Sequence, residues 1–143
     1  MSSGSKIQAS CMTAGAVCGL GWWLFIDGAS IAALLGRPIL WWYTIPGILA
    51  TFAAIMMIGI DWEALRGSVF GGVEVTQARA WFLLSIGIFT SALILAIYIL
   101  ISRYTGESNI GVDPWPGTSI VIQTFLVYIS AIIFASGRYA YSN

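Results

Sequence analysis

The side chain in this sequence best placed to carry chemistry is a lone carboxylate, Asp27, at the far end of an uncharged stretch. A carboxylate inside the hydrocarbon of a bilayer costs on the order of 3 kcal/mol, so it should face protein or water rather than lipid. There it would serve as a proton or ion site, or as a buried contact to a polar group of a partner. The alternative places Asp27 at the membrane interface, where it caps its helix or pairs with Arg37. The sequence leaves both interpretations open.

Other groups with catalytic or metal-binding chemistry are scarce. The chain has no histidine, hence no Ser/His or Cys/His pair, and no phosphate-binding glycine loop followed by lysine. Asp61 and Glu63 flank Trp62 at an expected water interface, where carboxylates are ordinarily solvated. Cys11 and Cys18 are spaced to lie on one helical face, where a disulfide between them is not expected. The sequence predicts no enzyme, no metal site and no cofactor.

The elements that must position these groups are apolar helices. The chain is 59% hydrophobic and 8% charged, against roughly 25% charged residues in soluble domains. About 20 apolar residues cross the roughly 30 Å hydrocarbon core. Spans are predicted at about 8–35, 38–60, 80–102 and 116–137. We therefore expect an all-α polytopic membrane protein, a four-transmembrane-helix bundle in one domain, 1–143.

The links between the spans are short. The Ser/Gly-rich tail Met1–Lys6 is predicted to be disordered, and Asp61–Arg79 is the one sizeable polar loop, in which Asp61–Leu65 could continue the second span by a turn. The six basic and six acidic residues cancel, so no charged surface indicates nucleic acid.

Small and polar residues within the spans indicate where helices pack. Gly15 and Gly19 form a Gly-x-x-x-Gly pattern that lets another backbone approach closely, and Gln123 places an amide in the fourth span, where it is expected to bond to a neighbouring helix. The predicted helix-packing or partner-binding residues are Gly15, Gly19, Trp22, Trp23, Asp27 and Gln123.

Basic residues predict the orientation. Lys6, Arg66, Arg79 and Arg138 fall on the side of the termini and middle loop, against Arg37 and Arg103 on the other. The excess favours cytosolic N- and C-termini. The predicted membrane-boundary residues are Arg79, Trp81 and Arg138.

Short blocks in the same order along the chain resemble the transmembrane protein 50 family, whose fungal members include vacuolar protein sorting 68. The blocks are Gly21-Trp22-Trp23, Asp27, Arg66-Gly67, Thr76, Ala78-Arg79, Trp81, Pro116-Gly117, Gln123 and Gly137-Arg138. The segment between Arg66 and Thr76 is shorter than in animal members, which puts loop-mediated contacts in doubt.

This resemblance implies a four-span protein without known catalysis. Fungal members act in endosome-to-vacuole traffic with a second small four-span protein of the vacuolar protein sorting 55 type, so membrane lipids and such a protein are the expected partners and an endosomal or vacuolar membrane the expected location. Asp27, Arg79, Gln123 and Arg138 are the polar residues that the likeness marks for testing.

The interpretation from sequence is a membrane subunit of a sorting complex that works by helix–helix association in the bilayer. Two alternatives stay open, a small proton-coupled transporter or channel that uses Asp27, and an accessory subunit of a larger membrane enzyme. The depth of Asp27 in the membrane, and whether it faces a water-filled cavity, separates the transporter from the sorting subunit.

Overall fold

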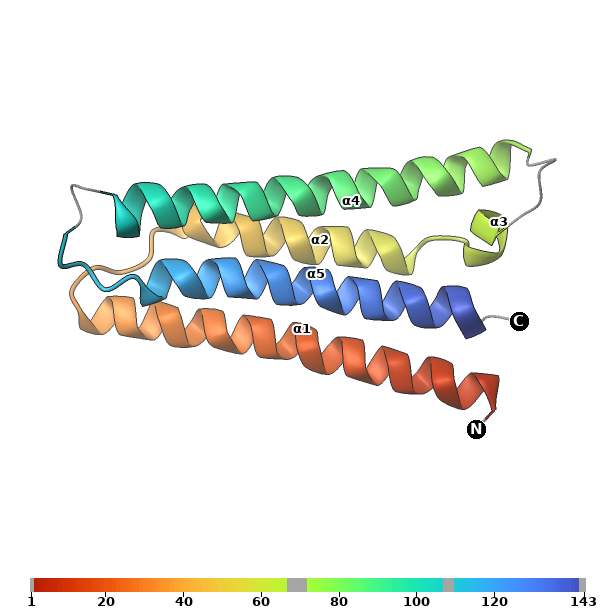
Figure 1. Ribbon diagram of the computed structural model, residues 1–143, viewed down its shortest axis with the longest axis horizontal. Helices are drawn as coiled ribbons and strands as arrows, with labels where there is room; N and C mark the ends of the chain where they lie inside the picture. The colour runs from red at the N-terminus through yellow and green to blue at the C-terminus, as the bar shows by residue number, and fades with distance from the viewer. Residues whose placement is uncertain (1, 67–71, 107–109, 142–143) are drawn as a thin grey trace.

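The computed structural model describes residues 2–66, 72–106 and 110–141, which form a bundle of long helices (Figure 1). Four helices are long and apolar enough to cross a membrane, and the described residues include no strand. The elements in chain order are α1 (Ser3–Leu34), the 3₁₀ turn η1 (Trp41–Thr44), α2 (Ile45–Ile58), α3 (Trp62–Arg66), α4 (Val73–Leu100), the π-helical turn η2 (Ile101–Thr105) and α5 (Trp115–Tyr141). The expected all-α, four-span class is confirmed.

The first helix begins earlier than predicted. Ser2 is its N-cap, with the hydroxyl oxygen accepting a hydrogen bond from Ser5 N at 3.3 Å. Such a cap satisfies one of the backbone N–H groups that a helix leaves free at its start. The prediction of a disordered tail over Met1–Lys6 is therefore wrong from Ser3 onward, because capping and contacts of the next turns with α5 hold the segment in the helix.

The second span is shorter than 38–60 and does not run on through Asp61–Leu65. Residues 38–40 are not helical, and the helix breaks at Gly59 before the separate turn of α3. The Asp61 carboxylate starts that turn, since its Oδ1 accepts from Glu63 N and Ala64 N, both at 3.0 Å. A side chain that satisfies these N–H groups makes a new helix start favourable over continuation.

The third span, in contrast, is longer than 80–102. Helix α4 begins at Val73, so the polar residues 73–79 are helical rather than loop. The Trp81 indole donates to the carbonyl oxygen of Met56 at 3.0 Å and ties the early turns of α4 to the last turn of α2. The loop glycines Gly67 and Gly71 lie outside the described residues.

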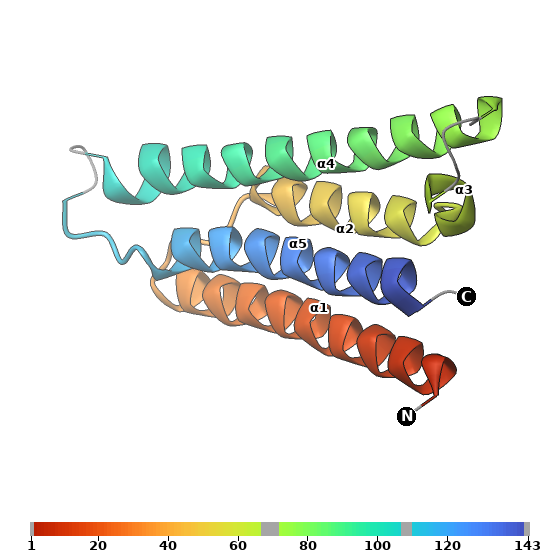
Figure 2. The same ribbon diagram turned by 45° about the vertical axis from the view of Figure 1, so that its right-hand side comes forward.

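The long helices lie side by side, and each runs antiparallel to the one before it in the chain, so that α2 and α5 point the same way (Figures 1 and 2). Helix α5 contacts α1, α2 and α4, and α2 also packs on α4. Helix α1 packs almost entirely on α5. Both termini and α3 lie at one end of the bundle, and the α1–α2 and α4–α5 connections lie at the other.

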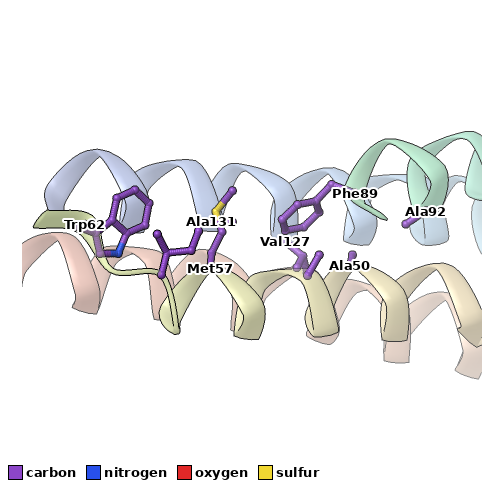
Figure 3. Close-up of a cluster of buried hydrophobic side chains, with 9 residues drawn as sticks. Ala50, Met57, Trp62, Phe89, Ala92, Val127 and Ala131 are labelled. Atoms are coloured by element: carbon purple, nitrogen blue, oxygen red, sulfur yellow. The ribbon is translucent and has the colours of Figure 1, made fainter. Parts of the chain in front are cut away.

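The core lies where α2, α4 and α5 meet, and small side chains there allow the helices to approach closely. Ala50, Ala92 and Ala131 bring the backbones close, while Phe89 and Met57 fill the space between them (Figure 3). A second cluster, nearer the connections, gathers Phe25, Tyr43, Ala96, Ile99, Tyr104 and Ile120. Large aliphatic side chains on the outside, such as Ile48, Ile55, Leu83 and Ile94, are exposed, as a bilayer requires of lipid-facing positions.

Candidate functional site

Helices α1 and α5 meet along a seam of small residues. A Cβ added to Gly21 would lie 3.2 Å from the carbonyl oxygen of Gln123, and one added to Gly28 would overlap the Ser119 hydroxyl. Near the other end, Gly137 is closed in the same way by Ser10. Close packing of helices at small residues is a main source of helix association in membranes, where the hydrophobic effect does not distinguish protein from lipid.

The predicted glycine stripe is not this seam. Gly15 and Gly19 are exposed, and a Cβ added to either would meet nothing within 4 Å. Trp23, on the same stripe, is 70% exposed. At about 100° per residue this stripe lies nearly opposite the buried positions Gly21 and Gly28. As packing residues within the bundle these three predictions are wrong; as contacts for a partner chain they stay a prediction.

Trp22 links the first helix to the second. Its indole Nε1 donates to Thr51 Oγ1 at 3.1 Å, and Thr51 Oγ1 donates to the Gly47 carbonyl at 2.8 Å. The ring also meets Phe25 edge to face at 5.8 Å between centroids. Because α1 otherwise packs on α5, this short chain of hydrogen bonds is its polar attachment to α2.

Gln123 lies at the centre of the bundle with 0% of its surface exposed. Its amide lies against Gly47, where an added Cβ would be 2.5 Å from Nε2. Neither Oε1 nor Nε2 has a hydrogen-bond partner among the described residues, contrary to the expected bond to a neighbouring helix. A buried polar group without a partner destabilises a fold by about 1–3 kcal/mol. Gly47 makes room for this amide without bonding to it.

Asp27 lies near an end of the bundle. It is exposed, and its Oδ2 accepts from the indole Nε1 of Trp115, the first residue of α5, at 2.9 Å. It precedes the end of α1 at Leu34 by about 10 Å along the helix axis. Asp27 lines neither of the two cavities described below. This geometry supports the interfacial interpretation, with Trp115 rather than Arg37 as the partner.

The three predicted boundary residues all lie toward the end that carries the termini. Arg79 is exposed on α4, and Trp81 is half exposed with its indole bonded to α2. Arg138, in the last turn of α5, is half-buried, and its Nε has no partner in the described part of the chain. Long basic side chains of this kind bury their stems and direct the charge toward water.

Two cavities open at opposite ends of the bundle. One of about 740 Å³ lies between the end of α2, α3 and the start of α4, beside Asp61, Glu74, Gln77 and Trp81. The other, of about 320 Å³, lies at the end with the two connections and is lined in part by Arg37, Tyr104 and Asp113. The sequence analysis missed this second group, whose members come from three separate segments.

These features define a class: a four-span membrane helix bundle held by small-residue contacts, with most of its mass inside the bilayer. The family described as "Uncharacterised protein family (UPF0220)" matches residues 1–141. A "Transmembrane protein 50 homolog" of Dictyostelium discoideum is 31% identical over 130 residues, which cover 84% of this chain and 83% of that protein. No solved structure matches. The chain belongs to the transmembrane protein 50 (UPF0220) family and is an integral multi-pass membrane protein.

Proposed function

We propose that this protein is a non-catalytic subunit of a membrane complex for protein sorting between the endosome and the vacuole or lysosome. It acts by lateral helix–helix association with a second small four-span protein of the vacuolar protein sorting 55 type. The protein resides in the endosomal or vacuolar membrane with both termini in the cytosol. The sorting role and the partner come from the likeness of the sequence blocks to the fungal family members.

The observation that supports association with a partner is the face of α1 that no other described helix of this chain covers. A helix of 32 residues packs almost entirely on one neighbour, and its opposite face presents Gly15, Gly19 and Trp23. Two outward glycines one turn apart leave a shallow groove that a second transmembrane helix can enter. Trp23 beside them offers a large aromatic surface for contact.

Asp27 supports association over proton-coupled transport. A coupling acid must reach a water-filled path through the membrane, whereas this carboxylate is bonded to Trp115 near the end of the bundle. Because Asp27 on α1 is bonded to Trp115 on α5, it helps to fix the end of α1. It thereby holds the face with Gly15 and Gly19 in position.

The test is a pull-down in mild detergent from cells that express a tagged form of this protein. We expect Gly15→Leu combined with Gly19→Leu to reduce the co-purified four-span partner by about tenfold, equal to about 1.4 kcal/mol, because the leucines fill the groove. A Cβ added at either glycine would meet no atom of this chain within 4 Å, so the fold of the variant should be intact.

Gly87→Leu is the matched control. Gly87 is also an exposed helical glycine whose Cβ would meet nothing within 4 Å, but it lies on α4. It should leave the partner yield unchanged. Equal yields from the double variant, the control and the original protein would refute the proposed face.

A further inference from the structure

The smaller cavity is built by the two connections at the end of the bundle away from the termini. Gly36 and Gly111 both have positive φ, 70° and 89°, a conformation that glycine adopts without strain. These turns place Arg37 from one connection and Asp113 from the other on the wall of the same 320 Å³ cavity. Leu35 and Ile110, both exposed, are part of its apolar lining.

Tyr104 is turned into this cavity by the π-helical turn. The buried positions of α4 follow a helical spacing through Ala96 and Ile99 that would continue at residue 103. The wider turn of η2 adds one residue, so Arg103 faces outward and Tyr104 faces inward. Single π-turns of this kind occur often at functional sites.

Packing fixes the ring of Tyr104 at the edge of this cavity. The ring packs on Gly117, where an added Cβ would lie 2.5 Å from Cδ2, and meets Tyr43 edge to face at 6.2 Å. The side chain is only 8% exposed and lines the cavity. Among the described residues its hydroxyl makes no hydrogen bond. As part of the cavity wall, this side chain offers a hydroxyl donor to a ligand.

The charged groups of the cavity are of both signs. The Arg37 side chain is exposed and forms no ion pair within the described ranges. Asp113 uses Oδ1 to accept from Trp115 N at 2.9 Å and forms no ion pair among the described residues. A guanidinium and a tyrosine hydroxyl suit a phosphate, and a carboxylate suits an ammonium group.

Aromatic residues place the cavity at the level of lipid headgroups. Trp41 is 81% exposed, Trp42 lies under the guanidinium of Arg103 at 5.6 Å, and Trp115 begins α5. Tryptophans concentrate at the membrane–water interface, where the ring is partly in hydrocarbon and the N–H reaches polar groups. A ligand in this cavity is therefore at the depth of phosphates and headgroup amines.

We propose that this cavity binds the headgroup of a zwitterionic phospholipid. Arg37 and the Tyr104 hydroxyl hold the phosphate, Asp113 holds the ammonium group, and the acyl chains leave over the apolar lining into the bilayer. A volume of about 320 Å³ is at the lower end of ligand sites, which suits a headgroup without its tails.

The test is native mass spectrometry of the purified full-length chain with defined lipids added in detergent. We expect retention of phosphatidylethanolamine and weak retention of diacylglycerol, which has the tails but no phosphate. Tyr104→Phe and Arg37→Gln should each lower phosphatidylethanolamine retention by about tenfold. Arg103→Gln, which removes an arginine from the same end of the bundle but outside the cavity, is the matched control and should retain the lipid.

Asp113→Asn tests recognition of the ammonium group. Asparagine keeps an oxygen that can accept from Trp115 N but removes the charge. The preference for phosphatidylethanolamine over phosphatidylglycerol should then fall toward one. An unchanged preference would contradict the role given to Asp113.

Three results would overturn the proposal. They are equal retention of diacylglycerol and phosphatidylethanolamine, equal losses for Arg37→Gln and Arg103→Gln, and full displacement of the lipid by O-phosphoethanolamine at the same concentration, which would indicate a site for a free phosphate compound. Tyr104→Phe keeps the buried ring, so it tests the hydroxyl even if the arginine variant unfolds. The assay contains no partner protein, so its outcome is independent of the sorting role.

Discussion

At the scale of single residues, Gln123 and Gly47 show how a polar group is accommodated inside the bundle. The amide lies against the Cα of Gly47 and finds no hydrogen-bond partner among the described residues. This arrangement destabilises the folded state, because the amide loses its hydrogen bonds to water on burial and gains none within the bundle. Shape, rather than hydrogen bonding, explains why a side chain of this length fits there.

We therefore expect Gln123→Met, which keeps the length and removes the amide, to raise the free energy of unfolding by about 1 kcal/mol. The measurement is thermal unfolding of the purified protein in detergent. Gln8→Met, on the exposed side of α1, is the control and should have no effect. A lower stability for Gln123→Met would show that the amide is bonded in solution, through a buried water or a ligand.

At the scale of elements, α1 carries two glycine faces with opposite roles. One face, with Gly21 and Gly28, is closed by α5, and the other, with Gly15 and Gly19, is open. Only the first contributes to the stability of the isolated chain. Both faces of α1 carry a pair of glycines, four residues apart at Gly15 and Gly19 and seven apart at Gly21 and Gly28, so the role of each pair depends on which face α5 covers.

Substitution on the two faces should separate stability from association. Gly28→Leu should lower the free energy of unfolding by about 2 kcal/mol, because the side chain would overlap Ser119 and push α1 from α5. Gly19→Leu should leave it unchanged within about 0.5 kcal/mol. The check is the same detergent unfolding assay, and similar losses in both variants would contradict the assignment of the faces.

At the scale of the whole molecule, both termini and α3 share one end, and the α1–α2 and α4–α5 connections share the other (Figure 2). The cavity lined by Arg37 and Tyr104 lies at these connections. We propose that both termini are cytosolic. In that orientation the proposed headgroup site lies in the lumenal leaflet and the larger cavity opens toward the cytosol.

This orientation can be measured by cysteine labelling in intact vesicles, on a background with Cys11 and Cys18 replaced by alanine. Glu63→Cys, at an exposed position of α3, should react with an impermeant maleimide added from the cytosolic side. Ile110→Cys, exposed at the other end, should react only after the membrane is opened. The reverse pattern would invert the predicted topology.

The sequence by itself determined the number of spans and the class of the fold. Runs of apolar residues long enough to cross a bilayer leave the backbone no alternative to helices, since lipid offers no hydrogen bonds. Hydropathy did not predict the helix starts that Ser2, Asp61 and Val73 mark, because capping and contacts between helices fix them.

Only the tertiary structure decided which face of each helix is buried. A helix made of apolar residues all around has no sequence periodicity to separate lipid from protein, because both surroundings are equally apolar. Gly15 and Gly19 were therefore predicted as packing residues while Gly21 and Gly28 form the seam. The sequence also does not show that Tyr104 faces inward, because the π-helical turn that orients it has no hydropathy signal. Only the packed helices bring Tyr104 together with Arg37 and Asp113.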